Sequence, residues 1–133
     1  MADAVTSQTL LDADRNVVMK FTNLSDGTGE SAVTKVDPAL LNAFSGGGTP
    51  TEVSIDFIIA STFGMAVNIL WDATSDVTAW ICGQSESGKI YDFRPFGGIR
   101  NNAGSGKTGK IQFTTVGHSA NDSYSIILGM RKA

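Results

Sequence analysis

The stretch that decides the fold reads VSIDFIIASTFGMAVNILW, from Val53 to Trp71. Apolar residues alternate with other residues along 53–60 and again along 65–71. Because successive side chains of a β-strand point to opposite faces of a sheet, this period of two predicts one strand in each half. Residues 61–64 join the two strands over a hairpin-length connection. The residues expected to share one buried face are Val53, Ile55, Phe57 and Ile59 in the first strand, and Met65, Val67, Ile69 and Trp71 in the second.

Two residues break this one-sided pattern. Ile58 lies on the face opposite Phe57, and Leu70 lies on the face opposite Trp71. An apolar face outside the core either packs against a partner or lies under glycine-rich loops, and the sequence leaves both explanations open.

Outward from this stretch, the same period recurs along most of the chain. Further strands are expected at residues 16–22, 31–36, 77–82, 89–93, 110–116 and 123–131, with turns rich in Gly, Asp and Ser between them. Asp37 and Pro38 predict a capped helical turn within 39–44. About eight strands predict an all-β fold, an antiparallel β-sandwich or jelly-roll-like barrel. Residues 1–15 are expected to be an N-terminal arm, ahead of a single domain at 16–133.

The composition agrees with one all-β domain. The chain has 133 residues, of which 41% are hydrophobic, so it is long enough to form one core. Charged residues make up only 17%, and Glu occurs three times, which disfavours a helical bundle. The formal net charge is −3, so no nucleic-acid partner is expected. The sequence contains no uncharged apolar stretch of about 18 residues, so no membrane span is expected.

The first residues and the single cysteine indicate in which cellular compartment the protein folds. The N-terminal stretch lacks the basic region and apolar core of a signal peptide, so the protein is expected to fold in a cytoplasm. Cys82 is the only cysteine, which excludes an internal disulfide and a thiolate metal cluster. Asp26 and Glu30 could offer oxygen ligands, but two carboxylates in a turn are normally solvated. Neither a metal nor another cofactor is expected.

No catalytic motif passes inspection. Residues 103–108 read AGSGKT, but a phosphate-binding loop needs Gly at position 101, which is Asn101, and a helix where a strand is expected. His118, Ser119 and Asp122 are the residue types of a catalytic triad, yet neighbours within one polar hairpin turn rarely form one. The chain is therefore predicted not to be an enzyme.

Trp71 and Trp80 lie on either side of the turn that contains Asp72 and Asp76. Exposed tryptophans would form a platform on which sugars stack, whereas buried ones belong to the core. Tryptophan is highly buried on average, so the core is favoured. The two carboxylates are expected to cap the turn.

Three stretches resemble small proteins from the structural gene modules of tailed bacteriophages: TNLSDGTGESAVTKVD at 22–37, ILWDAT at 69–74 and GKTGKIQFTT at 106–115. The resemblance covers most of the chain after the arm. It implies a virion protein of the capsid decoration or cement type, and such proteins are commonly β-sandwich trimers seated where major capsid subunits meet.

The resemblance also implies partners and a location. The partners are the major capsid protein and further copies of this chain, as a homo-oligomer such as a trimer. The location is the capsid surface of a virion assembled in the bacterial host cytoplasm. A tail, neck or adaptor component of the virion is the alternative, and a carbohydrate-binding surface module is a further one.

Candidate contact residues lie in two segments. Leu10, Leu11 and Arg15 stand in the polar arm, and Ile99 and Arg100 stand in a glycine-rich loop. We expect these five residues to contact the capsid or a neighbouring subunit, because an arm that orders on docking can add a strand, and an oligomer multiplies weak contacts.

Overall fold

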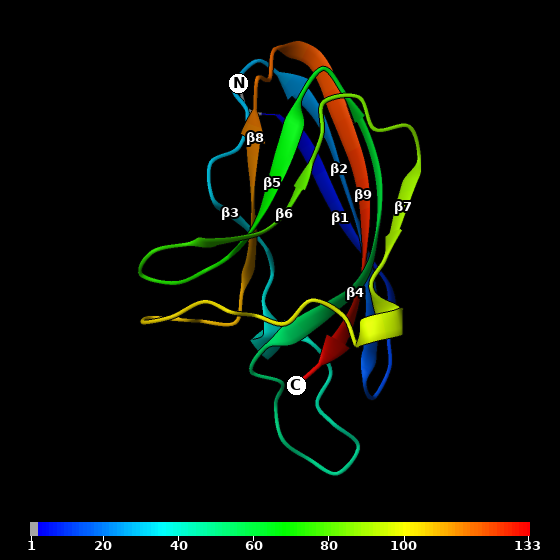
Figure 1. Cartoon of the computed structure of the whole chain (residues 1–133), viewed down its shortest axis with the longest axis vertical. Coiled ribbons are helices and arrows are strands. Elements are labelled where there is room, and N and C mark those ends of the chain that lie inside the picture. The colour runs from blue at the N-terminus through cyan, green and yellow to red at the C-terminus, as the bar shows by residue number, and fades with distance from the viewer. Residues whose placement is uncertain (1–2) are drawn as a thin grey trace.

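The computed structural model describes residues 3–133, which form two antiparallel β-sheets packed face to face (Figure 1). The larger sheet has the order β1-β2-β9-β4-β7, with bounds Ala4–Asp12, Asn16–Asp26, Ala120–Lys132, Val53–Phe63 and Lys89–Asp92. The smaller sheet has the order β3-β8-β5-β6, with bounds Val33–Val36, Ile111–Val116, Ala66–Trp71 and Val77–Cys82. The predicted all-β antiparallel sandwich is confirmed. Both sheets keep free edges, so the fold is not a closed barrel.

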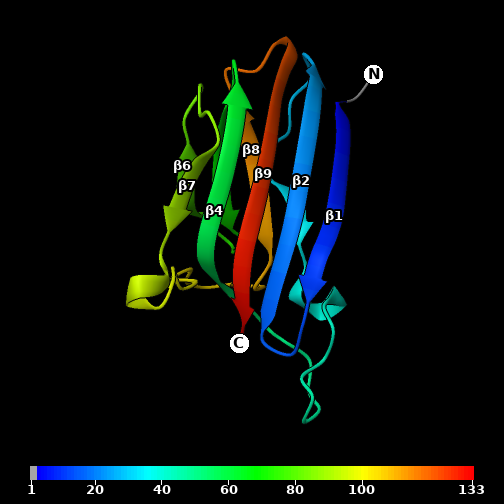
Figure 2. The same ribbon diagram turned by 90° about the vertical axis from the view of Figure 1, so that its right-hand side faces the viewer.

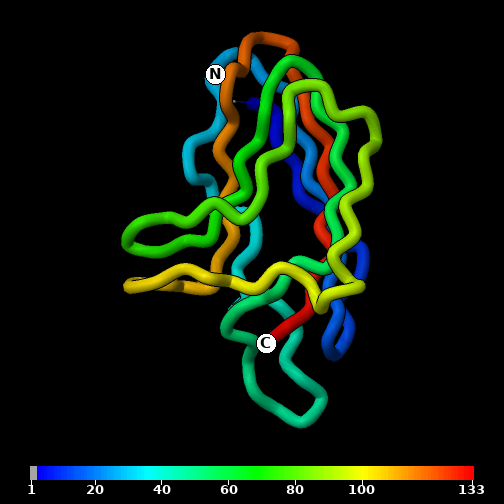
Figure 3. Tube along the Cα trace, in the orientation of Figure 1, coloured from blue at the N-terminus to red at the C-terminus, as the bar shows by residue number. Residues whose placement is uncertain are grey.

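Strands β2 to β9 pair in a nested order. β2 pairs with β9, β3 with β8, β4 with β7 and β5 with β6, all of them antiparallel. This is the strand order of a jelly-roll sandwich, in which one long hairpin is rolled over itself. The repeated passage of the chain between the two layers can be followed in Figure 3.

The first residues are not a separate arm. Residues 4–12 form β1, which extends the larger sheet by pairing with β2 through a tight turn closed by a bond from Ala13 N to Asn16 O at 2.9 Å. Side chains along β1 are exposed on both faces except at Asp12. A strand without a buried face carries no alternation of apolar residues, which is why the sequence pattern indicated an arm. Residues 1–2 of the expected arm lie outside the described residues.

Two connections expected as hairpins instead cross between the sheets. β4 and β5 belong to different layers, although only residues 64–65 separate them. Gly64 has a φ of +76° and donates its N–H to Gln84 O at 3.1 Å, so this corner is tied to the β6–β7 connection. The turn at 117–119 likewise joins β8 to β9 in the other sheet. A short polar turn has the same sequence signal whether it closes a hairpin or an arch between layers.

A bulge corrects the expected alternation in β4. The pairing of β4 with β9 shifts between Ile55 and Phe57. The extra residue resets the period of two, so Ile58 and Ala60 are fully buried while Phe57 and Ile59 are only partly buried. Phe57 therefore belongs to the outer face of the larger sheet, not to the core.

The core lies between the two sheets and is centred on aromatic rings. Trp71 and Tyr124 are its largest buried side chains, and Phe113 lies edge-on to Phe21 at 5.3 Å between ring centroids. Cys82 is fully buried, and this burial, with the charge of Glu86, raises its thiol pKa to about 12.

The predicted capped turn is confirmed, but it is shorter than expected. Asp37 Oδ1 accepts a hydrogen bond from Ala39 N at 3.1 Å, and the turn is a 3-10 helix over Pro38–Leu40. Asp37 is therefore the N-cap, and the missing N–H of Pro38 costs nothing in the first turn.

Candidate interaction surfaces

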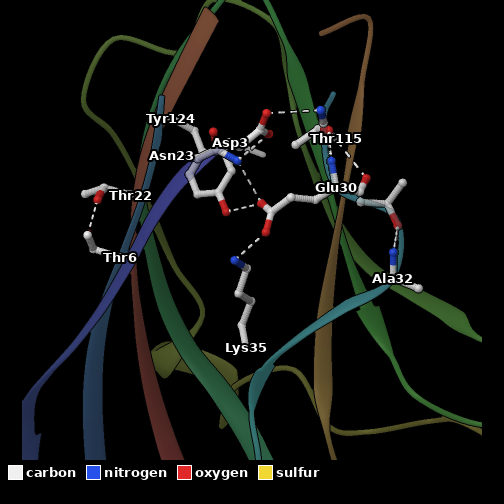
Figure 4. Close-up of polar contacts among 11 residues, drawn as sticks. Asp3, Thr6, Thr22, Asn23, Glu30, Ala32, Lys35, Thr115 and Tyr124 are labelled. Carbon is white, nitrogen blue, oxygen red and sulfur yellow. Dashed lines mark hydrogen bonds and ion pairs between the residues drawn. The ribbon is translucent and has the colours of Figure 1, made fainter. Parts of the chain in front are cut away.

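One side of the sandwich, between β2 and β3, is closed by a buried polar network around Glu30 (Figure 4). Glu30 Oε1 accepts hydrogen bonds from Asn23 Nδ2 at 3.0 Å and from Tyr124 Oη at 2.5 Å. Glu30 Oε2 lies 2.5 Å from Lys35 Nζ, and both of these side chains are at most 5% exposed. Burial, together with the hydrogen bond to Glu30, raises the pKa of Tyr124. Removing one member of this ion pair would leave the other charge buried without compensation.

Asp3 ties the beginning of β1 to this network. Its carboxylate accepts hydrogen bonds from Asn23 Nδ2 at 3.1 Å, from Ser25 Oγ at 3.3 Å, and from the backbone N–H groups of Asp26 and Gly29 at 3.2 Å each. Burial alone would raise the pKa of Asp3, but these hydrogen bonds outweigh it and hold the pKa below its ordinary value. An ionised carboxylate therefore anchors the start of β1.

Asp12 anchors the other end of β1. Asp12 Oδ1 lies 2.6 Å from Lys132 Nζ, whose side chain is fully buried. Lys132 Nζ also donates to the carbonyl oxygens of Ala13 at 2.6 Å and Asn42 at 2.8 Å. Burial alone would raise the pKa of Asp12, but Lys132 and the N–H of Asn42 hold it below its ordinary value. Two carboxylates thus fasten β1 at its two ends.

The opposite side of the sandwich, between β6 and β7, is closed by aromatic rings. The Trp80 ring centroid lies 5.0 Å from that of Tyr91 and 4.9 Å from that of Phe93. Phe93 is 6% exposed and packs on Phe96, which is 70% exposed. Tyr91 Oη donates to Glu86 Oε1 at 2.8 Å, and this hydrogen bond raises the pKa of Tyr91. Packed aromatic rings therefore close the β6–β7 side of the sandwich, and the ion pair of Glu30 and Lys35 closes the β2–β3 side.

Three of the predicted contact residues lie at the β1 edge. Leu10 and Leu11 belong to β1 and are 47% and 48% exposed. Leu10 is the extra residue of a bulge between Thr9 and Leu11. Arg15 lies in the β1–β2 turn, with its guanidinium 5.0 Å from the centroid of the Phe44 ring.

Leu11 borders a shallow groove on the outer face of the larger sheet, the face seen in Figure 2. Phe57 lies across Gly129, where a Cβ would come within 2.0 Å of the ring, and the Arg94 guanidinium covers the ring at 5.3 Å. Glycine in the central strand thus makes room for an aromatic ring of its neighbour. The groove has a volume of about 230 Å³ and is lined by Leu11, Asn16, Val18, Asp56, Phe57, Arg94, Gly129 and Met130.

Ile99 and Arg100 lie elsewhere. Ile99 pairs with Ile55 through two backbone hydrogen bonds, of 2.9 and 2.8 Å, and packs against the core. Arg100 lines a separate cavity of about 620 Å³ beside the C-terminal residue. The five predicted residues therefore do not form one site. The two hollows adjoin where Arg131, which lines the larger one, lies 3.8 Å from Asp56, which lines the groove.

The residues that resembled catalytic motifs have other partners. His118 Nδ1 lies 3.1 Å from Thr115 Oγ1, whereas Ser119 donates directly to Asp122 Oδ2 from its N–H at 2.8 Å and its Oγ at 3.2 Å. A triad would need the histidine between the serine and the aspartate, so these residues are arranged as a turn. Within residues 3–133, three or more metal-binding side chains come together nowhere.

The other two motifs also take structural roles. In the AGSGKT loop, Ser105 O accepts from Thr74 N at 3.1 Å, which ties the loop to the β5–β6 turn. Asp76 Oδ1 accepts from Ala73 N at 3.1 Å, as expected for a turn cap. Trp71 is fully buried and Trp80 partly buried, so the pair forms no exposed platform for sugars.

The feature that the sequence reasoning missed is the free edge of β1. β1 is the outermost strand of the larger sheet (Figure 2), and every side chain from Ala4 to Leu11 is exposed. None of these residues is charged. An uncharged run of eight residues near the N-terminus was the available signal, but exposed polar residues predicted an arm equally well.

Comparison with known proteins adds no identity. No protein-family model matches the chain, and no curated protein matches it. Among the described residues, no helix is both long enough and apolar enough to span a membrane.

Proposed function

We propose that this protein is a non-enzymatic structural component of a bacteriophage particle that binds the outside of the capsid and stabilises it. The proposal starts from the resemblance of residues 22–37, 69–74 and 106–115 to virion proteins. The observation that carries it is the groove on the outer face of the larger sheet, where Leu11 and Phe57 leave apolar surface beside the Arg94 guanidinium. An exposed hollow with a partly apolar lining is a surface on which another protein can dock.

The fold supports the proposal without deciding it. Jelly rolls occur in viral capsid domains and also in lectins, so the strand order by itself assigns no function. The buried Trp71 counts against the carbohydrate-binding alternative. The proposed partner is the major capsid protein, whose repeated copies would convert weak contacts into stable attachment.

The test is the copy number of this protein in purified particles of its source phage, relative to the major capsid protein, by quantitative mass spectrometry. A ratio near one to one, or a simple lattice fraction of it, is the expected result. A handful of copies per particle would instead indicate that the protein is a tail, neck or adaptor component. Absence from the particles would overturn the proposal altogether.

The resemblance implies a trimer, which is the alternative to the dimer proposed in the next subsection. Sedimentation equilibrium of the purified protein measures the assembly directly. Symmetric assembly would multiply the number of capsid contacts made by each particle-bound unit.

A further inference from the structure

The four sheet edges of the molecule are not equally protected. β7 has four residues, two of them the charged Lys89 and Asp92, and β3 has four residues that include Lys35. β6 has six residues, and its pairing with β5 is interrupted by a bulge. β1 has nine residues and carries no charge from Ala4 to Leu11. Short length, charge and bulges are the devices that prevent strands from pairing with another chain, and β1 lacks the first two.

The single bulge of β1 is placed where it does little to block a partner. The pairing of β1 with β2 is regular from Ala4 to Thr9 and shifts only at Leu10. Among the described residues, no strand pairs with the outer edge of β1. A regular stretch with free backbone N–H and C=O groups is a template for one further antiparallel strand.

The order of residues in β1 fits a second copy of the same strand. In an antiparallel pair related by a two-fold axis, residues directly opposite must face the same side of the sheet. Every register centred on a residue of the regular stretch satisfies this condition, and Ser7 is the middle of the seven residues that remain between Ala4 and Leu11 once the bulged Leu10 is left out. The register centred on Ser7 places Ser7 opposite Ser7, Thr6 opposite Gln8, Val5 opposite Thr9, and Ala4 opposite Leu11. Each of these pairs is uncharged, and the smallest polar side chain stands on the axis.

Charge at the two ends of β1 agrees with this antiparallel arrangement. Asp3 and Asp26 make the start of β1 acidic, whereas at its end Asp12 is balanced by Lys132 at 2.6 Å, and Asp14 in the following turn is balanced by Arg15. Antiparallel pairing brings the acidic start of each copy to the electrically balanced end of the other. Parallel pairing would bring Asp3 and Asp26 toward their own copies, which like charges disfavour.

We propose that two copies of this chain pair antiparallel through the free edges of β1, around a two-fold axis at Ser7, and form one continuous ten-stranded sheet. The two copies would contribute the same surface to each other, as in most symmetric dimers. One pair of strands makes a small interface, so the dimer is expected to dissociate on dilution. The proposal predicts a dimer where the phage resemblance implies a trimer, and it does not depend on the phage function.

The experiment uses sedimentation equilibrium of the full chain from about 1 µM to about 1 mM, a range suited to a small interface. The wild type is expected to shift from monomer to dimer within this range. Ser7→Lys places two lysines opposite each other on the axis and is expected to weaken the dimer about ten-fold or more. Ser7→Glu should do the same, and Ser61→Lys, an exposed position of the same sheet away from the edge, should leave the dimer unchanged.

Mixing the two charge variants distinguishes a specific loss of pairing at Ser7 from a general destabilisation of the fold. Ser7→Lys and Ser7→Glu chains, each monomeric alone, are expected to form a mixed dimer, because opposite charges then meet on the axis. Native mass spectrometry distinguishes this species by its mass. A wild type that stays monomeric, a trimer, a dimer insensitive to Ser7→Lys, or charge variants that fail to combine would each overturn the proposal.

Discussion

The two sides of the sandwich are closed by different chemistry. Between β2 and β3, the ion pair of Glu30 and Lys35 lies under Tyr124, whereas between β6 and β7 the rings of Trp80 and Phe93 pack together. The aromatic side ends in the short, charged strand β7, and the polar side ends in the long strand β1, which carries no charge from Ala4 to Leu11. The side chains of β1 are almost all exposed, so β1 is held by its backbone hydrogen bonds to β2 and by the carboxylates of Asp3 and Asp12 at its two ends. A strand held in this way leaves its outer edge available.

The largest expected effect comes from breaking the polar side. Lys35→Met leaves the Glu30 carboxylate buried without its counter-charge, and should lower the free energy of unfolding by about 4 kcal/mol. Urea denaturation monitored by circular dichroism measures the change. The double variant Glu30→Gln, Lys35→Met removes both charges and should recover much of the loss. A loss below about 1 kcal/mol for the single variant would mean that the pair is hydrated in solution.

The matched change on the aromatic side should cost somewhat less. Phe93→Ala removes a ring that is only 6% exposed and packed on Trp80, and should lower the free energy of unfolding by about 3 kcal/mol. Phe96→Ala, at a ring that is 70% exposed, is the control and should change it by less than about 0.5 kcal/mol. Equal effects at the two positions would show that this side is not closed by Phe93.

The pH dependence of stability should come partly from the start of β1. The pKa of Asp3 is lower in the folded protein, so its contribution is complete above the ordinary pKa of about 4 and is lost as the pH falls through the folded value. Asp3→Asn should lower the free energy of unfolding by about 1 kcal/mol at pH 7, because the amide keeps one acceptor oxygen but loses the charge that strengthens these hydrogen bonds.

Asp3→Asn should also make the free energy of unfolding depend less on pH at acid pH. Urea midpoints measured between about pH 2 and pH 7 test this, because the wild type should lose its advantage over Asp3→Asn below about pH 4. A constant difference between the two proteins across this range would assign the effect to packing and not to ionisation.

The smallest effect concerns the exposure of the aromatic side. In Trp80→Phe the remaining fluorescence comes from Trp71, which is fully buried, so acrylamide should quench it very little. The wild type, which also contains the partly buried Trp80, should be quenched somewhat more. Strong quenching of Trp71 would reopen the possibility of a sugar-binding platform.

Much of the fold could be predicted because it depends on local patterns. The period of two located eight of the nine strands, and residues 77–82 were bounded as the structure has them. The cap at Asp37 also follows from neighbouring residues. β1 was missed because its side chains have no buried face, and a pattern of burial cannot indicate a strand that buries nothing.

The candidate surfaces were less predictable. Leu10, Leu11 and Arg15 do lie on an exposed edge, but Ile99 packs against the core by pairing with Ile55. No local pattern relates Ile99 to a residue more than forty positions earlier. Phe57 was expected in the core, and a bulge of one residue transferred it to the outer groove.

By itself, the sequence determined the composition of an all-β domain, the strand positions with a buried face and the absence of charge from Ala4 to Leu11. Only the tertiary structure decided which turns are hairpins, which strands share a sheet and which edges remain free. The physical reason is that periodicity and turn chemistry act between neighbours in the chain. The pairing of β2 with β9, or of Glu30 with Tyr124, depends instead on residues about a hundred positions apart that meet only in the folded core.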